Sequence, residues 1–231
     1  MIATMIARYL ASMIMGYLLG SIPFGLILAR KMANIDVREW GSGKVGATNV
    51  MRSAGTKVAL LSGLLDILKG AAAVLLAGLI IGKTYVPIGS FGFGPLLGQV
   101  LAGIAAVAGH NWSIFLQFRG GSGVATFFGG WLALFPMVAI LGGEILFLGA
   151  ASTLFVSLGS IAGVVGTYAI VIPLTIVSGL PIEYLLYAFI GMGMIIYTHR
   201  YNIVRLFNGK ERKLGEKAER NPVTAANKGH R

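Results

Sequence analysis

The sequence contains no cysteine and few charged residues. Without cysteine the chain has no disulfide, no thiolate nucleophile and no thiol metal site. Only 12% of its 231 residues are charged, about half of the roughly 25% typical of soluble domains. The absence of an HExxH motif and of carboxylate clusters argues against metal catalysis. The absence of GxxxxGK[ST] excludes a Walker-type phosphate loop.

The scarcity of charge leaves long apolar runs. No charged residue occurs from Tyr9 to Ala29 or from Ile145 to Ile182. A helix needs about 20 apolar residues to cross the hydrocarbon core of a bilayer. The mean hydropathy of the whole chain is +0.80. The sequence therefore predicts an all-α, polytopic integral membrane protein.

We predict about seven transmembrane helices. Pro23 lies inside the first predicted span, and we expect the helix to continue through it because membrane helices accept proline. The predicted spans are residues 9–29, 58–81, 95–108, 124–141, two within 145–182 divided at Ser157–Ser160, and 184–197. Residues 1–211 then form a single membrane domain. We expect residues 212–231 to be a basic, disordered cytoplasmic tail.

The positive charge is distributed unevenly. The net charge is +11, which in a soluble protein would suggest nucleic acid as a partner. Here Lys and Arg collect in residues 30–57 and after residue 198, which is typical of cytoplasmic loops attracted to anionic lipid. We therefore expect membrane lipid and no nucleic acid as a partner. Six spans between these regions place the N-terminus outside and the C-terminus in the cytoplasm.

Three polar stretches interrupt the apolar sequence, and they are Trp40–Arg52, His110–Thr126 and His199–Glu211. They follow the first, third and seventh predicted spans and therefore share one membrane face. Irregular backbone beside membrane spans usually lines a binding site. In the second stretch, glycines followed directly by a helix offer backbone N–H groups to an anion. We expect the three stretches to hold phosphate groups.

Several single residues have two interpretations. Asp66 and Lys69 lie three apart in a predicted span, and we interpret them as an internal ion pair rather than as part of the site. The planar guanidinium of Arg52 matches a phosphate, although the positive-inside bias also explains an arginine there. His110 and His199 lie at span edges, where a lone histidine is more often a structural hydrogen bonder than a base.

The polar stretches also resemble a known family. GSGKVGATNVMR, HNWSIFLQFRGGSGVAT and HRYNIVRLFNGKE resemble, in order, the three motifs of bacterial membrane-integral acyl-phosphate:glycerol-3-phosphate acyltransferases. LLDILKG at 64–70 and SLGS at 157–160 extend the resemblance to nearly the whole chain before Glu211. It implies a seven-helix protein of the inner membrane, with a cytoplasmic active site. The implied reaction joins an acyl group from acyl phosphate to glycerol 3-phosphate, giving lysophosphatidic acid and phosphate.

The resemblance and the residue chemistry together predict the site. We assign catalytic roles to Ser42, Arg52, His110 and Arg119. Substrate or phosphate binding is assigned to Lys44, Thr48, Asn49, Gly120, Gly121, Ser122, Gly123, Ser157, Ser160, His199, Asn202, Arg205 and Glu211. We predict no metal, no cofactor and a monomeric protein.

The chain departs from the family pattern at several positions. Lys44 stands where the family usually has asparagine, and RGGSG at 119–123 replaces KGGKG, so that Ser122 replaces a lysine. Ser113 replaces a usual proline. We hypothesise that Lys44 supplies the cation that position 122 lacks.

Alternatives remain for the mechanism and for the function. The proton acceptor is His110 or a phosphate oxygen of the acyl donor, and we favour the phosphate because acyl phosphate brings a weak base to the hydroxyl. A His and Asp five residues apart, typical of acyl-CoA enzymes, is not found, since Phe115 and Val204 occupy those positions. A transporter of an organic phosphate and a non-catalytic lipid-binding protein are the alternative functions.

Overall fold

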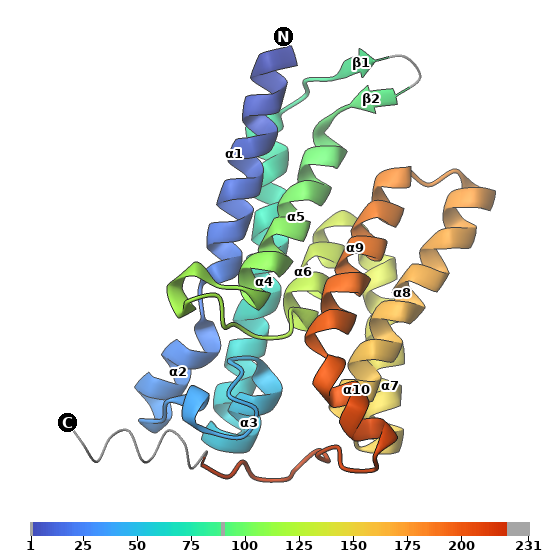
Figure 1. Cartoon of the computed structure of the whole chain (residues 1–231). Helices are drawn as coiled ribbons and strands as arrows, with labels where there is room; N and C mark the ends of the chain where they lie inside the picture. Colours follow the sequence, from blue (N-terminus) through green and yellow to red (C-terminus); the bar gives the residue numbers. More distant parts are fainter. Residues whose placement is uncertain (1, 89–90, 221–231) are drawn as a thin grey trace.

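The computed structural model describes residues 2–88 and 91–220 and is built mainly from helices (Figure 1). The longer helices are α1 Ile2–Ser21, α4 Thr56–Ile81, α5 Pro95–Asn111, α7 Pro136–Thr153, α8 Val156–Ser178 and α9 Ile182–Thr198. The shorter ones are α2 Phe24–Ala33, α3 Ala47–Ala54, α6 Val124–Leu134, α10 Arg200–Phe207 and the 3₁₀ turns η1 Val37–Glu39 and η2 Ile114–Leu116. Strands β1 Val86–Ile88 and β2 Phe91–Phe93 pair antiparallel between α4 and α5. The predicted helical fold is thus confirmed, with one added hairpin.

Several helices are long and apolar enough to cross a membrane. Within the described residues five segments meet this condition, if α1 and α2 are counted as one segment of 32 residues. Helices α9 and α10 meet at 61° and together make a sixth. Helix α6 has 11 residues, about half of the length that a span needs. A multi-pass membrane protein is therefore supported, and the count of seven stays a prediction.

The structure corrects three predicted helix boundaries. The predicted span 124–141 is broken, because α7 begins at Pro136, whose ring cannot continue the hydrogen bonds of α6. The uncharged run 145–182 divides at Leu154, where φ is +63°, and not at Ser157–Ser160, which lie in α8. Pro23 separates α1 from α2 and does not lie inside a continuous helix.

An aromatic cluster joins α6 to α9. The ring of Phe127 stacks on that of Tyr187 with centroids 5.2 Å apart, and Trp131 meets Tyr187 edge to face at 5.1 Å. All three side chains are buried. The hydroxyl of Tyr187 donates to the carbonyl oxygen of Phe127 at 3.0 Å, which satisfies a polar group that the apolar core would otherwise leave unpaired. These contacts fix α6, whose N-terminus faces the site described below.

The predicted ion pair in α4 forms in the protein interior. Lys69 Nζ lies 2.8 Å from Asp66 Oδ1, and both side chains are buried. Lys69 also donates to the carbonyl oxygen of Ile22 at 2.9 Å, beside the break between α1 and α2. The pair thus neutralises two charges within a span and ties α4 to the α1–α2 corner.

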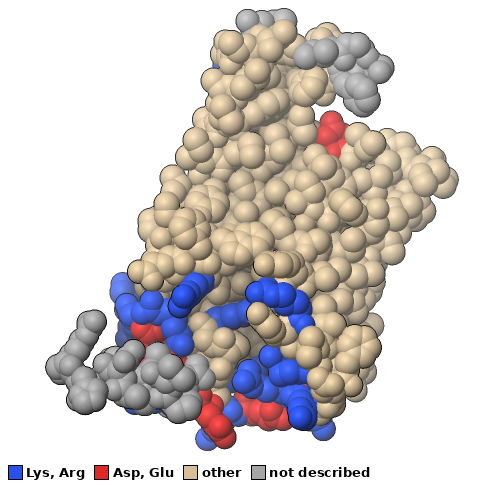
Figure 2. Space-filling view, viewed as in Figure 1, with Lys and Arg blue, Asp and Glu red and all other residues tan. Residues whose placement is uncertain are grey.

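Charged side chains gather at one end of the molecule. Figure 2 shows Lys and Arg around the end that carries α2, α3 and α10 in Figure 1, while the visible face between the two ends is almost free of charge. A surface of this kind suits a protein whose middle faces lipid and whose basic end faces anionic headgroups.

Helices α4 and α6 approach closely at Gly70, where an added Cβ would meet the carbonyl oxygen of Thr126. We expect Gly70→Ala to destabilise the protein by about 1–3 kcal/mol, because the two backbones must separate. The measurement is the melting temperature in detergent. Gly193→Ala is the matched control, since no described atom lies within 4 Å of a Cβ added there. Equal melting temperatures for the two variants would contradict this account of the α4–α6 contact.

Candidate functional site

A cavity of about 460 Å³ is lined by residues from all three polar stretches. The structure therefore brings together segments that are far apart in the sequence. The polar lining residues are Ser42, Lys44, Thr48, Asn49, Arg52, Asp66, His110, Ser122, Ser157, Ser160, His199, Asn202, Glu211 and Arg212. The cavity has a second, apolar part between α6 and α7, described below.

Asn49 organises the loop that precedes α3. Its side-chain NH₂ group donates to the carbonyl oxygens of Val37, Trp40 and Lys44 at 2.9–3.0 Å. Its side-chain oxygen accepts from the backbone N–H of Ser42 at 3.1 Å. Because these bonds use its polar atoms, Asn49 acts by shaping the loop that presents Ser42 and Lys44 to the cavity.

Lys44 is a cation at the centre of the polar lining. Its ammonium group donates to the carbonyl oxygen of Thr198 at 2.5 Å and to Ser122 Oγ at 3.1 Å. It thus links the first stretch to the second and to Thr198, which directly precedes the third. Burial, together with the positive charges of Arg200 and Arg205, lowers the pKa of Lys44 to about 8. The ammonium lies beside Ser122, as required by the hypothesis that Lys44 supplies the cation that position 122 lacks.

The predicted cradle of glycine amides is only partly present. The N–H of Gly120 donates to the carbonyl oxygen of Asn111 at 3.1 Å, and that of Gly121 donates to the carbonyl oxygen of His110 at 2.9 Å. These two amides therefore satisfy the C-terminal carbonyl groups of α5 and do not face a ligand. Added Cβ atoms would meet the His110 backbone at Gly120 and the His110 ring at Gly121. Close packing on α5 is the reason for glycine at both positions.

The amides that follow these glycines are available for a ligand. Ser122 and Gly123 line the cavity, and within the described chain their N–H groups have no hydrogen-bond acceptor. Gly123 has φ +77° and precedes α6, so that the unpaired N–H groups of the first turn of α6 also point toward this end of the cavity. A helix N-terminus carries partial positive charge and binds anions.

Arg52 also presents an unpaired donor. Its Nη2 donates to the carbonyl oxygens of Arg212 at 3.0 Å and Lys213 at 3.2 Å. Its Nε is buried, and no described residue accepts its hydrogen. Burial lowers the pKa of Arg52. A buried N–H without an acceptor is rare in proteins, and the Arg52 residue that carries it lines the cavity.

Arg119 does not join the site. It is exposed and does not line the cavity. Gln117 and Phe118 both have positive φ, +52° and +61°, and the chain folds back so that the Phe118 N–H donates to the carbonyl oxygen of Ser113. This turn places Arg119 on the outer side of the loop. Of the two arginines to which we assigned catalytic roles, Arg52 therefore lines the cavity and Arg119 does not.

Glu211 joins the third stretch to α8. Its carboxylate accepts from Ser157 Oγ at 3.1 Å, Asn202 Nδ2 at 2.8 Å and Arg205 Nε at 2.7 Å. Glu211 is buried, and these donors compensate for the lost hydration of its charge. Ser157, Asn202 and Glu211 line the cavity, whereas Arg205, to which we assigned substrate binding, does not. Ser160 Oγ, also on α8, donates to the carbonyl oxygen of Val156.

The two predicted histidines are both buried. His110 Nδ1 lies 3.5 Å from Asp66 Oδ1, and its ring packs against Gly121. His199 Nδ1 contacts the carbonyl oxygen of Ile195 at 2.8 Å. Both side chains line the cavity while their ring contacts hold the surrounding backbone. Asp66, which we interpreted as structural, lines the cavity as well.

The apolar part of the cavity lies between α6 and α7. Its lining residues include Phe128, Leu132, Ala139, Ile140, Gly143 and Leu146. Leu132 is 43% exposed and Ile140 is 52% exposed, which shows that this part reaches the apolar outer surface. The cavity thus joins a cationic end to an apolar groove. Within the described residues, no group of three His, Cys, Asp or Glu side chains could hold a metal ion.

The pKa of Lys44 gives a testable pH dependence. Lys44 is charged below about pH 8 and becomes neutral above it, so that the affinity of the cavity for inorganic phosphate should fall as the pH rises through 8. In Lys44→Arg the charge persists, because arginine does not titrate in this range. The measurement is the ratio of the two proteins' phosphate affinities from pH 6.5 to 9.5, in which the ionisation of phosphate itself cancels. A constant ratio would contradict the assignment of Lys44 as an anion ligand.

Comparison with known proteins shows extensive similarity. The sequence profile of the glycerol-3-phosphate acyltransferase family matches residues 10–209. Glycerol-3-phosphate acyltransferase 3 of Dehalococcoides mccartyi (strain CBDB1) is 56% identical over 214 residues, which are 93% of this chain and 99% of that protein. The glycerol-3-phosphate acyltransferase of Clostridioides difficile (strain 630) is 39% identical over 214 residues, with the same coverage.

A solved structure is also similar. The glycerol 3-phosphate form of PlsY, an integral membrane glycerol 3-phosphate acyltransferase, superimposes with a TM-score of 0.77. It is 36% identical in sequence, and the match covers 90% of this chain and 96% of that one. The lysophosphatidic acid form of PlsY gives a TM-score of 0.75 at 35% identity.

Proposed function

This chain belongs to the glycerol-3-phosphate acyltransferase family, and from that premise we propose that it transfers a fatty acyl group from acyl phosphate to glycerol 3-phosphate. The products are lysophosphatidic acid and phosphate. The observation that carries this proposal is the form of the cavity, in which Lys44, Arg52 and the N-terminus of α6 surround one end and an apolar groove forms the other. Such a cavity suits a phosphate group joined to an acyl chain.

Two anionic substrates must come close together in this cavity. Two unit charges 4 Å apart repel by about 4 kcal/mol at an effective dielectric constant of 20. The ammonium of Lys44, the guanidinium of Arg52 and the N–H groups of Ser122 and Gly123 offset this repulsion. Their positions are fixed before the substrates bind, so that little reorganisation is needed during the reaction. Ser42, at the edge of the cavity, orients the acceptor molecule.

The acyl transfer needs no enzyme nucleophile, because acyl phosphate is already activated. The acceptor hydroxyl oxygen attacks the acyl carbon, the bond from this carbon to the phosphate oxygen breaks, and phosphate leaves. A phosphate oxygen of the donor takes the hydroxyl proton. His110 serves to hold the glycine loop against α5, since its ring is engaged by Asp66 and Gly121. Positioning of the two substrates supplies most of the acceleration.

We also propose how the protein lies in the membrane. The basic end shown in Figure 2 faces the cytoplasm, in keeping with the positive-inside rule. The protein lies in the bacterial inner membrane as a monomer, with seven helical segments, the short α6 included, and with its N-terminus outside. This orientation lets soluble glycerol 3-phosphate enter from the cytoplasm, while the acyl donor enters from the bilayer.

The central test is the release of phosphate from palmitoyl phosphate by the purified protein in lipid nanodiscs. We expect release only when glycerol 3-phosphate is present. Arg52→Ala should lower kcat/KM for glycerol 3-phosphate by about 10²–10³-fold, because a preorganised donor to the phosphate of this substrate is lost. Lys31→Ala removes an exposed cation outside the cavity and serves as the control. Binding without release would support the non-catalytic alternative, and phosphate flux into proteoliposomes would support a transporter.

The apolar groove makes a separate prediction about acyl chain length. Gly143 lines the groove, and no described atom lies within 4 Å of a Cβ added there. We therefore expect Gly143→Leu to fill the groove without disturbing the helices. The variant should lower kcat/KM for palmitoyl phosphate at least about tenfold more than for octanoyl phosphate, because only the longer chain needs the filled space. Gly193→Leu, on an exposed face of α9, is the control, and an equal loss for both chain lengths would contradict the groove assignment.

A further inference from the structure

The described part of the tail, residues 212–220, crosses the end of the molecule that carries α2, α3 and α10. We call these residues the C-terminal strap. In Figure 1 the strap runs from the end of α10 along the lower edge of the molecule to a position beneath α3. It lies beyond residues 209 and 211, where the family profile and the sequence resemblance end. We expected only a disordered tail here, and the remaining residues of that tail lie outside the described part.

The strap contacts Arg52 from two directions. The carbonyl oxygens of Arg212 and Lys213 accept hydrogen bonds from Arg52 Nη2, at 3.0 and 3.2 Å. The N–H of Ala218 donates to the backbone carbonyl oxygen of Arg52 at 3.0 Å. The strap therefore holds both the guanidinium group and the main chain of this residue. Arg52 Nε is buried and has no hydrogen-bond partner among the described residues, and the residue itself lines the cavity.

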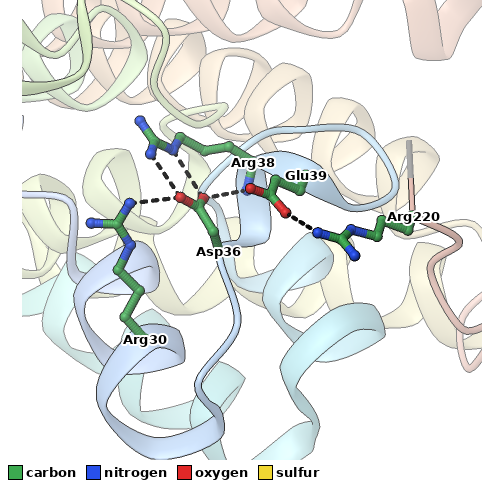
Figure 3. A network of polar contacts seen from close by, with 5 residues as sticks. All are labelled: Arg30, Asp36, Arg38, Glu39 and Arg220. Carbon is green, nitrogen blue, oxygen red and sulfur yellow. Dashed lines mark hydrogen bonds and ion pairs between the residues drawn. The ribbon is translucent and has the colours of Figure 1, made fainter. Parts of the chain in front are cut away.

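The far end of the strap is fastened to the first polar stretch. The N–H of Gly41 donates to the carbonyl oxygen of Glu219 at 2.9 Å, and Trp40 forms a β-bridge with Arg220. Arg220 Nη2 also lies 2.9 Å from Glu39 Oε2 (Figure 3). Since Ser42 follows Gly41 directly, the strap borders the loop that presents Ser42.

The segment that precedes Glu39 and Trp40 is itself held in place by ion pairs. Asp36 accepts hydrogen bonds from both Arg38 and Arg30 (Figure 3). These bonds, that of Arg38 first, hold the pKa of Asp36 well below its usual range, so that the network stays charged at neutral pH. Near its start, the strap is attached to the α7–α8 corner by the bond from the Leu214 N–H to the carbonyl oxygen of Leu154 at 2.7 Å.

We propose that the C-terminal strap is a positioning element for phosphate binding, which fixes the Arg52 guanidinium at the glycerol 3-phosphate end of the cavity. The inference rests on the proposed function. Arg52 lies on α3 at the end that the strap crosses, whereas the apolar groove lies between α6 and α7. The strap carbonyl groups occupy Nη2 and thereby set the direction in which Nε points. Arginine has high side-chain entropy, so that a guanidinium fixed in advance loses less freedom on binding phosphate.

Two truncated chains test this proposal in lipid nanodiscs. The first ends after Glu211 and lacks the strap, and the second ends after Arg220 and keeps it. Loss of the strap should raise the KM for glycerol 3-phosphate at least about tenfold, since small displacements of positioning groups have large kinetic effects. The KM for palmitoyl phosphate and the melting temperature should stay within twofold and within a few degrees of the full chain. The longer truncation product should match the full chain.

A full-length variant tests the same contact without creating a new chain terminus near the site. Ala218→Pro deletes the N–H that bonds to the Arg52 carbonyl oxygen, and it should also raise the KM for glycerol 3-phosphate selectively. Ala225→Pro, the same change outside the strap, is its control. Unchanged KM values in the strapless chain, a rise for palmitoyl phosphate alone, or a parallel rise for both substrates with a lower melting temperature would overturn the proposal. A full chain that lacks activity would instead overturn the proposed function, and the strap inference with it.

Discussion

The rest of the structure depends on keeping two partly buried cations, Lys44 and Arg52, charged beside an apolar groove. A cation that leaves water needs other polar partners. Here those partners are backbone carbonyl oxygens from distant segments, since Thr198 serves Lys44 and the strap residues Arg212 and Lys213 serve Arg52. Carbonyl groups stabilise a cation without neutralising it as a carboxylate would. The site can therefore keep its net attraction for phosphate while the cations hold the loop, α9 and the strap together.

Close packing of backbone supplies the second part of the design. Helix α6 is short, and its N-terminus reaches the cavity because the preceding loop turns back onto the end of α5. Gly120 and Gly121 make that turn possible, and their N–H groups close the open carbonyl groups of α5. The amides of Ser122 and Gly123, which have no acceptor among the described residues, then stand at the positive end of α6. One loop thus ends one helix and prepares an anion site at the start of the next.

Many polar residues around the cavity hold the surrounding segments together and use their polar atoms on other protein groups. Asn49 uses its amide on the loop before α3, and Glu211 draws α8, α10 and the start of the strap together. The Asp66–Lys69 pair joins α4 to the α1–α2 corner and brings Asp66 to His110. A membrane protein gains little from burying apolar helix faces against one another, because lipid is equally apolar. Polar contacts of this kind are therefore an important means of fixing its helices.

The sequence by itself determined the membrane class, the helical fold and the three polar stretches, because the lengths of apolar runs and the positions of glycine and charge are local properties. It also indicated the ion pair of Asp66 and Lys69 from their spacing on one helix. Only the tertiary structure decided that Arg119 faces outward, that Gly120 and Gly121 use their amides on α5, and that Lys44 lies at Ser122. The contacts of residues 212–220 with Arg52 were equally hidden, since residues 212–220 make them through main-chain atoms that every residue has. Such contacts depend on how distant segments meet in space, and no local pattern of side chains encodes them.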